Sequence, residues 1–206
     1  MNSLKKIVQV YEHGSKHWVG DGFPVRNLIP SSGIESEIDP FLMLDYAGPA
    51  QFEPTTEPRG VGEHPHRGFE TVTLAYQGSV EHRDSGGNSG TIHPGDVQWM
   101  TAGSGVVHEE KHERDFSKRG GSFEMIQLWV NLPKRHKMTK PRYQTIRNAD
   151  IPRLELGGSN YARVIAGKLG DLTGPAQTFT PITLIDVNMT TGTATFTMPI
   201  GQSSAL

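Results

Sequence analysis

The chain alternates short apolar runs with segments rich in glycine and proline. Val, Ile, Thr, Phe and Trp recur in these runs, a pattern typical of antiparallel sandwiches and barrels, whereas helical periodicity is weak throughout. The pattern predicts strands at residues 6–11, 41–46, 70–77, 79–83, 90–93, 97–100, 106–110 and 125–132. This number of short strands suits a small closed barrel or jelly roll, so we expect an all-β fold.

A basic, strand-poor segment follows these strands. Residues 133–141 contain Lys134, Arg135, Lys137 and Lys140, and we interpret 133–150 as an exposed linker between a barrel at 1–132 and a smaller unit at 151–206. The smaller unit has predicted strands at residues 161–166, 181–188 and 193–198. A unit of about 55 residues makes a poor independent core. We therefore expect it to pack against the barrel or against another chain. In the second case the protein would self-associate through this unit.

Composition narrows the classes of function. The chain of 206 residues has 20 basic and 22 acidic side chains and a formal net charge of -2, so it has no positive field to attract a phosphate backbone, and direct nucleic-acid binding is not expected. It has no cysteine and nine histidines, so any metal must bind to nitrogen and oxygen. The amino terminus lacks the apolar stretch of a secretion signal, and no apolar run approaches the roughly 18 residues of a membrane helix. We expect a soluble, cytoplasmic protein.

The stretch Glu63-His-Pro-His-Arg-Gly-Phe-Glu70 is the first candidate site. Side chains on a strand alternate between faces, so we expect His64, His66 and Glu70 to share one face with the apolar residues that follow. In a barrel this is the inward face, with polar ligands near one end and apolar packing deeper inside. Pro65 biases His64 toward an extended conformation, which favours convergence of the two imidazoles on one ion.

A second segment carries a matching set of side chains. Gly103 and Gly105 allow a sharp bend, and the next strand places His108 and Glu110 on one face. Three imidazoles and one carboxylate suit a divalent first-row metal. The alternative is a polar end of the barrel with hydrogen-bonded histidines and no ion. Spacing leaves open whether Glu110 or Glu70 is the carboxylate ligand, and one of them can bind while the other orients an imidazole.

Four segments carry a family resemblance. They are HPHRGFETVT, PGDVQWMTAGSGVVHEE, PFLMLD and QLWVNL, and they span residues 40–132. On these motifs the chain resembles the pirin family of the cupin superfamily. The resemblance implies a double-stranded β-helix or jelly-roll barrel of the bicupin type, with one metal in the amino-terminal barrel. It fades beyond the first strands of the carboxy-terminal unit, which implies a shortened second barrel.

The resemblance also implies roles for individual residues. The metal ligands would be His64, His66, His108 and Glu110, with Glu70 as a supporting side chain. The implied cofactor is one divalent transition metal ion, Fe(II) first, with Mn, Ni, Co, Cu or Zn as alternatives. Bacterial pirin-like quercetin 2,3-dioxygenases are the nearest functional parallel, so the expected substrates are a flavonol and O2, with ring opening and loss of CO. Glu110 would accept the proton of the flavonol hydroxyl group.

Two other functions compete with the dioxygenase. One is a metal- or redox-sensing module without turnover, which acts as a transcription cofactor and binds a protein partner. The other is a cupin isomerase or epimerase, which would need a basic pocket for an acidic or phosphorylated sugar, and only Arg67 lies beside the expected ligands. Trp99 and Trp129 are interpreted as packing residues, and the face occupied by Gln127 is left open. We expect surface or turn positions for the remaining histidines, which are His13, His17, His82, His93, His112 and His136.

Overall fold

The computed structural model describes residues 5–11, 14–29, 35–199 and 201–205. Its strands are β1 (Lys16–Val19), β2 (Phe23–Ile29), β3 (Phe41–Phe52), β4 (Gly60–His66), β5 (Phe69–Gln77), β6 (Val80–Asp84), β7 (Ser89–Ile92), β8 (Val97–Thr101), β9 (Val106–His112), β10 (Gly121–Asn131), β11 (Arg142–Ile146), β12 (Arg153–Gly157), β13 (Asn160–Ala166), β14 (Lys168–Leu169), β15 (Leu172–Thr173) and β16 (Leu184–Asn188). The helical segments are α1 (Glu35–Ile38), α2 (Arg114–Arg119), η1 (Lys134–His136) and η2 (Asn148–Asp150). Within the described ranges, no helix has the length and apolar character needed to cross a membrane.

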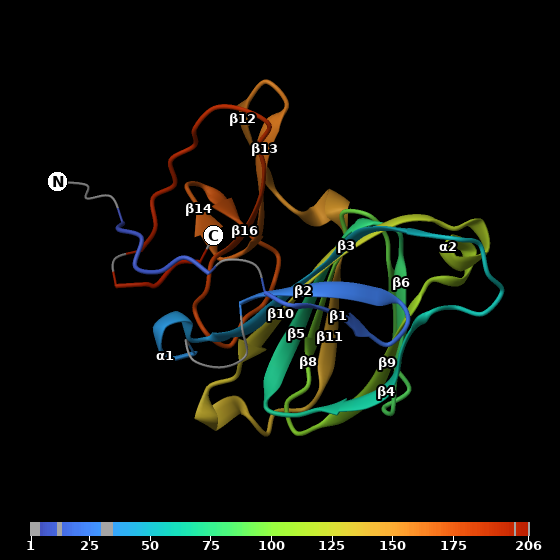
Figure 1. Ribbon diagram of the computed structural model, residues 1–206. Coiled ribbons are helices and arrows are strands. Elements are labelled where there is room, and N and C mark those ends of the chain that lie inside the picture. The colour runs from blue at the N-terminus through green and yellow to red at the C-terminus, as the bar shows by residue number, and fades with distance from the viewer. Residues whose placement is uncertain (1–4, 12–13, 30–34, 200, 206) are drawn as a thin grey trace.

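Two antiparallel sheets form the barrel (Figure 1). The larger has the strand order β1-β2-β3-β10-β5-β8-β11, and the smaller has the order β4-β9-β6-β7. Strand β9 is hydrogen-bonded on both sides, to β4 and to β6. Strands far apart in the sequence are thus neighbours in both sheets, as in jelly-roll folds. The all-β cupin architecture expected from the sequence is confirmed.

An apolar cluster from both sheets fills part of the barrel interior. Val80 and Ile92 of the smaller sheet pack with Phe23, Ala75 and Phe123 of the larger one, and each is at most 2% exposed. Each large apolar side chain buried in this way contributes about 1.5–3 kcal/mol. The cluster therefore holds the two sheets face to face.

The carboxy-terminal part covers the outer face of the seven-stranded sheet. Val72 and Trp99 of that sheet share one buried cluster with Ile165 and Ile182. Strands β12, β13 and β16 form a separate sheet beyond the barrel, and β14 pairs with β15 (Figure 1). The barrel and the carboxy-terminal part therefore share a continuous apolar core.

An ion pair between a buried arginine and a partly buried aspartate reinforces this junction. Arg163 on β13 pairs with Asp186 on β16 at 2.6 Å, and it also donates to the carbonyl oxygen of Gly95 in the barrel at 2.6 Å. The hydroxyl of Tyr76 on β5 donates to the same aspartate at 3.1 Å. Removing one member of such a network leaves a buried charge unpaired, so these contacts fix the carboxy-terminal sheet to the barrel.

Most of the predicted strands are confirmed, and two are wrong. Predicted strands coincide with or overlap β3, β5–β10, β13 and β16. Residues 6–11 and 193–198 form no strand. Ile7 and Val8 are 84% and 86% exposed, so their apolar side chains are not buried against a sheet. Strand β1 was not predicted because its residues are almost all exposed and show no apolar alternation.

The range interpreted as a linker contributes to the barrel. Strand β11 pairs with β8 and forms one edge of the seven-stranded sheet, while η1 contains Lys134 and Arg135 of the basic residues that precede it. The division into 1–132, 133–150 and 151–206 stays a prediction. Strand β11 shows that part of the middle range belongs to the first sheet.

Candidate metal centre

The two histidine motifs lie on adjacent antiparallel strands. His64 and His66 are on β4, and His108 and Glu110 are on β9. His64 stands opposite His108 in the ladder, and the register slips between Val61 and His64. Such irregularities bend a strand and redirect its side chains. Backbone pairing therefore brings the two motifs together, as the sequence predicted.

Three imidazoles form a compact group. One ring nitrogen from each of His64, His66 and His108 lies within 4.8 Å of the other two, and the ring centroids are 4.5 to 4.8 Å apart. Two nitrogens bound to one ion at about 2.1 Å are at most about 4.2 Å apart. The three rings are therefore close to the arrangement that a single ion requires.

A backbone contact orients His64. Its Nδ1 lies 2.8 Å from the carbonyl oxygen of Gly62. Because a carbonyl oxygen only accepts, Nδ1 is assigned as the protonated nitrogen. Nε2 then keeps its lone pair, and hydrogen bonds of this kind are common for histidines that bind metals.

The buried histidines have the properties of metal ligands. Both ring nitrogens of His108 are buried without a hydrogen-bond partner, and an unpaired buried polar atom costs about 1–3 kcal/mol. Burial, together with the neighbouring His108 and His64, lowers the pKa of His66 to about 3. Burial, together with His64 and His82, lowers the pKa of His108 to about 3. Neutral imidazoles bind metals, so a divalent first-row ion fits this group.

Glu110 lies beside the histidines and is 4% exposed. Burial raises the pKa of its carboxyl group, while a hydrogen bond from Gln127 opposes that rise. Its oxygens lie outside the group of three nitrogens that are mutually within 4.8 Å. The role of Glu110 as fourth ligand, which the resemblance implies, therefore stays a prediction.

Strand β10 supplies one wall of the site. Gln127, whose face the sequence left open, points inward and donates from Nε2 to the Glu110 carboxylate at 3.1 and 3.4 Å. Trp129 packs edge to face against His66, at 5.5 Å between centroids, and lies 4.5 Å from Phe69. The sequence contained a signal for this arrangement. Side chains alternate along β10, so Gln127 and Trp129 share one face of the strand and buried Leu128 lies on the other. The sequence did not show which of the two faces is the inner one.

Glu70 lies on the opposite face of the sheet from the one we predicted. Val72 and Leu74, which share its parity, pack against the carboxy-terminal part. Glu70 itself is 1% exposed and accepts a hydrogen bond from Thr101 at 2.6 Å. By contrast Thr73, of opposite parity, contacts Gln127 inside the barrel. The predicted supporting role of Glu70 therefore lacks the expected geometry.

The cause is a change of sheet between the two motifs. Strand β4 ends at His66 in the smaller sheet, and β5 begins at Phe69 in the larger one. Gly68, between them, has a φ of 78°, a conformation that favours glycine. The prediction assumed one continuous strand from His66 to Glu70. Because the chain changes sheets between these residues, they do not lie on the same face.

Two histidines expected at the surface are buried. His82 is 4% exposed and stacks on Tyr143 at 4.6 Å, and it stands opposite Glu110 in the β6–β9 ladder. His112 is 1% exposed and packs against Phe52 and Phe123. Alternation along the strands could have predicted these positions. His82 shares its face of β6 with buried Val80, and His112 shares its face of β9 with His108 and Glu110. His17 and His93 are exposed, His136 is partly exposed, and His13 lies outside the described residues.

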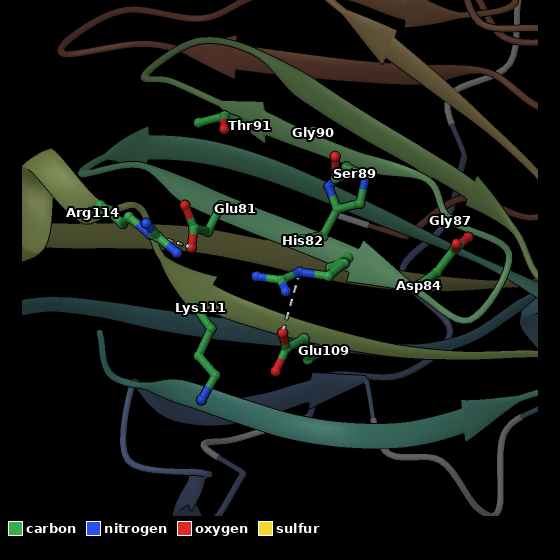
Figure 2. Close-up of a pocket in the computed structure, with 11 residues that line it drawn as sticks. Glu81, His82, Asp84, Gly87, Ser89, Gly90, Thr91, Glu109, Lys111 and Arg114 are labelled. Carbon is green, nitrogen blue, oxygen red and sulfur yellow. Dashed lines mark ion pairs between the residues drawn. The ribbon is translucent and has the colours of Figure 1, made fainter. Parts of the chain in front are cut away.

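The outer side of the four-stranded sheet carries a charged groove of about 440 Å³ (Figure 2). Glu109 pairs with Arg83 at 3.7 Å, and Glu81 pairs with Arg114 at 3.9 Å. The three histidines of the metal centre do not line this groove. Consecutive residues of β6, including buried His82 and Asp84, line the groove, and these two stand opposite Glu110 and His108 in the β6–β9 ladder.

Comparisons with known proteins identify the relatives of this chain. The Pirin family profile matches residues 22–130, more than half of the chain. A Pseudomonas aeruginosa protein named "Putative quercetin 2,3-dioxygenase PA2418" is 56% identical over 92% of this chain and 66% of its own length. Pirin-like protein 2 of Arabidopsis thaliana is 42% identical over 84% of this chain and 50% of its own length.

A solved structure shows the same fold. The crystal structure of a quercetin 2,3-dioxygenase from Acinetobacter baumannii matches with a TM-score of 0.88 and 55% identity, over 90% of this chain and 65% of that one. This chain therefore spans between half and two thirds of the length of these relatives. The motifs, the paired strands that carry them and these matches together show that the chain belongs to the pirin family.

Proposed function

We propose that this chain is a metal-dependent dioxygenase that opens the ring of a flavonol such as quercetin and releases CO. The observation that carries the proposal is the convergence of three imidazoles on one point, with both ring nitrogens of buried His108 left without hydrogen-bond partners. The names of the bacterial relatives point to the same reaction. The chain spans only part of the length of these relatives. We therefore base the proposed activity on the residues of the site and not on the names of the relatives alone.

The metal would be held by ring nitrogens of His64, His66 and His108 and by the carboxylate of Glu110. This nitrogen and oxygen donor set suits Fe(II), our first choice, and also Mn, Ni, Co, Cu or Zn. When bound, a divalent ion supplies a Lewis acid that stabilises the oxyanion of the flavonol 3-hydroxyl group. The ring nitrogens of buried His66 and His108 are neutral because their pKa values are lowered to about 3.

Glu110 would accept the proton of the flavonol 3-hydroxyl group. In the metal-free protein, burial raises the pKa of its carboxyl group. The amide of Gln127 donates to this carboxylate and holds it in place. Proton transfer to a positioned carboxylate leaves the flavonol as an electron-rich anion, which O2 attacks with cleavage of the ring.

Aromatic side chains support binding of a flat substrate. Trp129 is partly exposed and its ring lies at 32° to that of Phe69, with 4.5 Å between centroids. Both rings also lie next to His66. Aromatic pairs of this kind offer faces and edges on which a flavonol ring can pack.

Oxygen uptake tests the proposal. Protein reconstituted in turn with Fe(II), Mn, Ni, Co, Cu and Zn, with metal content measured, is mixed with quercetin, and O2 consumption and CO release are recorded together. A flavone that lacks the 3-hydroxyl group is the matched control substrate. We expect equal amounts of O2 consumed and CO released with quercetin, and neither with the flavone.

The opposite result would identify the competing function. Protein that carries a stoichiometric metal ion and consumes no O2 with any of these ions would overturn the dioxygenase proposal. A metal- or redox-sensing role with a protein partner would then be the better interpretation of the same site.

A further inference from the structure

A chain of hydrogen bonds runs from Trp129 to Glu110. The indole Nε1–H of Trp129 donates to Oε1 of Gln127 at 3.4 Å. The Gln127 amide nitrogen donates to the Glu110 carboxylate at 3.1 and 3.4 Å, and also to Oγ1 of Thr73 at 3.2 Å. All the polar atoms of the Gln127 amide are thus engaged.

These contacts fix the orientation of the amide. An indole N–H only donates, so the oxygen of Gln127 must face Trp129. A flipped amide would turn its oxygen toward the Glu110 carboxylate and its NH2 group toward the indole N–H, and both contacts would be repulsive. Both ends of Gln127 therefore select the same orientation, with its donor directed at Glu110.

The backbone around Gln127 is held as firmly as the side chain. Strand β10 is hydrogen-bonded to β3 on one side and to β5 on the other. Glu110 is 4% exposed, so few water molecules can replace the amide as donor. An amide on a central strand thus controls a buried carboxylate beside the metal centre.

We propose that Gln127, oriented by Trp129, is the positioning residue that fixes the Glu110 carboxylate and thereby sets the affinity and coordination geometry of the metal. The inference rests on the proposed function insofar as that function places Glu110 next to the ion. It assigns Trp129 a second role beside packing, because the indole N–H acts on Glu110 only through Gln127.

Metal binding without substrate tests this inference. The full chain and its Gln127→Leu, Trp129→Phe and doubly substituted variants are titrated with Co(II), and affinity and the visible absorption spectrum are measured. Gln144→Leu is the matched control, since Gln144 lies on β11 and bonds to Gln177 of the carboxy-terminal part. Circular dichroism confirms that each variant is folded.

We expect Gln127→Leu to weaken Co(II) binding about 10- to 100-fold, the usual effect of removing a partner of a metal ligand, and to alter the Co(II) spectrum. Trp129→Phe keeps an aromatic ring beside His66 and should produce a smaller change of the same kind. Because Trp129 acts through Gln127, the double variant should match Gln127→Leu alone. Gln144→Leu should leave affinity and spectrum unchanged.

Two outcomes would overturn the inference. One is an unchanged spectrum and affinity in Gln127→Leu, and the other is a double variant in which the two effects add. Failure of the wild-type chain to bind Co(II) would overturn it together with the metal centre. A wild-type chain that binds Co(II) and shows the expected coupling, but consumes no O2 with quercetin under any metal, would refute the proposed function and leave this inference intact.

Discussion

His64 and His108 face each other directly across the β4–β9 ladder, with their imidazole centroids 4.5 Å apart. The pair joins two motifs that are separated by more than forty residues in the sequence. Since β9 is also bonded to β6 on its other side, the ligands stand on paired strands rather than on loops. Sites built on such elements hold their geometry more accurately than sites built on loops.

Replacing His108 by alanine should abolish stoichiometric metal binding. His108 is 1% exposed and offers two unpaired ring nitrogens, and its removal leaves only two of the three imidazoles in the group. Loss of a direct ligand should weaken affinity by more than the about 10- to 100-fold typical of an outer partner. Elemental analysis after dialysis measures the change. His17→Ala, at an exposed position on β1, is the control, and full metal content in His108→Ala would refute the assignment.

Glu110→Gln should reduce flavonol oxidation more than it reduces metal content. Glutamine preserves the size of the side chain and removes its ability to accept a proton, and loss of a general base costs about 10²- to 10⁴-fold in rate. O2 uptake at saturating quercetin measures the effect. Glu109→Gln changes the neighbouring residue, which pairs with Arg83 on the outer face, and should retain activity. Equal rates in the two variants would exclude Glu110 as the proton acceptor.

Glu70→Ala should lower stability and leave metal binding intact. Its carboxyl group is buried on the outer face of the seven-stranded sheet and accepts a hydrogen bond from Thr101. Removing it leaves that hydroxyl without its partner, at a cost of about 1–3 kcal/mol in the free energy of unfolding. Urea denaturation and elemental analysis measure the two quantities. A loss of metal in folded Glu70→Ala would restore the role that the sequence predicted for Glu70.

The metal-free protein should lose stability as the pH falls from about 6.5 to about 4. Burial lowers the pKa of His112 to about 4, although its hydrogen bond to the carbonyl oxygen of Gly22 opposes this shift. In the unfolded chain histidine titrates near pH about 6.5. Between these values the unfolded state binds more protons, so the free energy of unfolding rises with pH and falls on acidification.

The slope provides the measurement for this prediction. A single histidine contributes up to about 1.4 kcal/mol for each pH unit in this window. His112→Phe should give a shallower dependence, because phenylalanine fits beside Phe52 and Phe123 but does not titrate. Urea denaturation at several pH values compares the two proteins. Identical slopes would show that His112 is protonated as easily in the folded protein as in the unfolded chain.

The sequence was sufficient to predict the all-β fold and the convergence of His64, His66 and His108. Both rest on local alternation within one strand, which β4 and β9 obey. The same logic failed at Glu70, because Gly68 carries the chain from one sheet to the other and the alternation starts again. Alternation is a property of each strand, and a sequence does not mark where one strand ends and the next begins in another sheet.

Other features depended on contacts between distant parts of the chain. Gln127 reaches Glu110 across the barrel, and no local pattern reveals which residue lies opposite. His112 is buried by aromatic residues from three strands and α2. Its parity with His108 and Glu110 was a local signal for an inward position, but the sequence does not show which distant aromatic residues surround it. The predicted strand at residues 6–11 had suitable side chains, but it pairs with no other strand among the residues that the structure describes.

The packing of Trp99 between the two parts of the molecule has a practical consequence. This indole is 0% exposed and is covered from outside by Ile165 and Ile182. A barrel expressed without the carboxy-terminal part would expose this apolar surface around Trp99 and aggregate. Truncated variants should therefore retain residues 151–188. In the intact chain, the fluorescence emission of Trp99 should shift to longer wavelength when the carboxy-terminal part separates from the seven-stranded sheet.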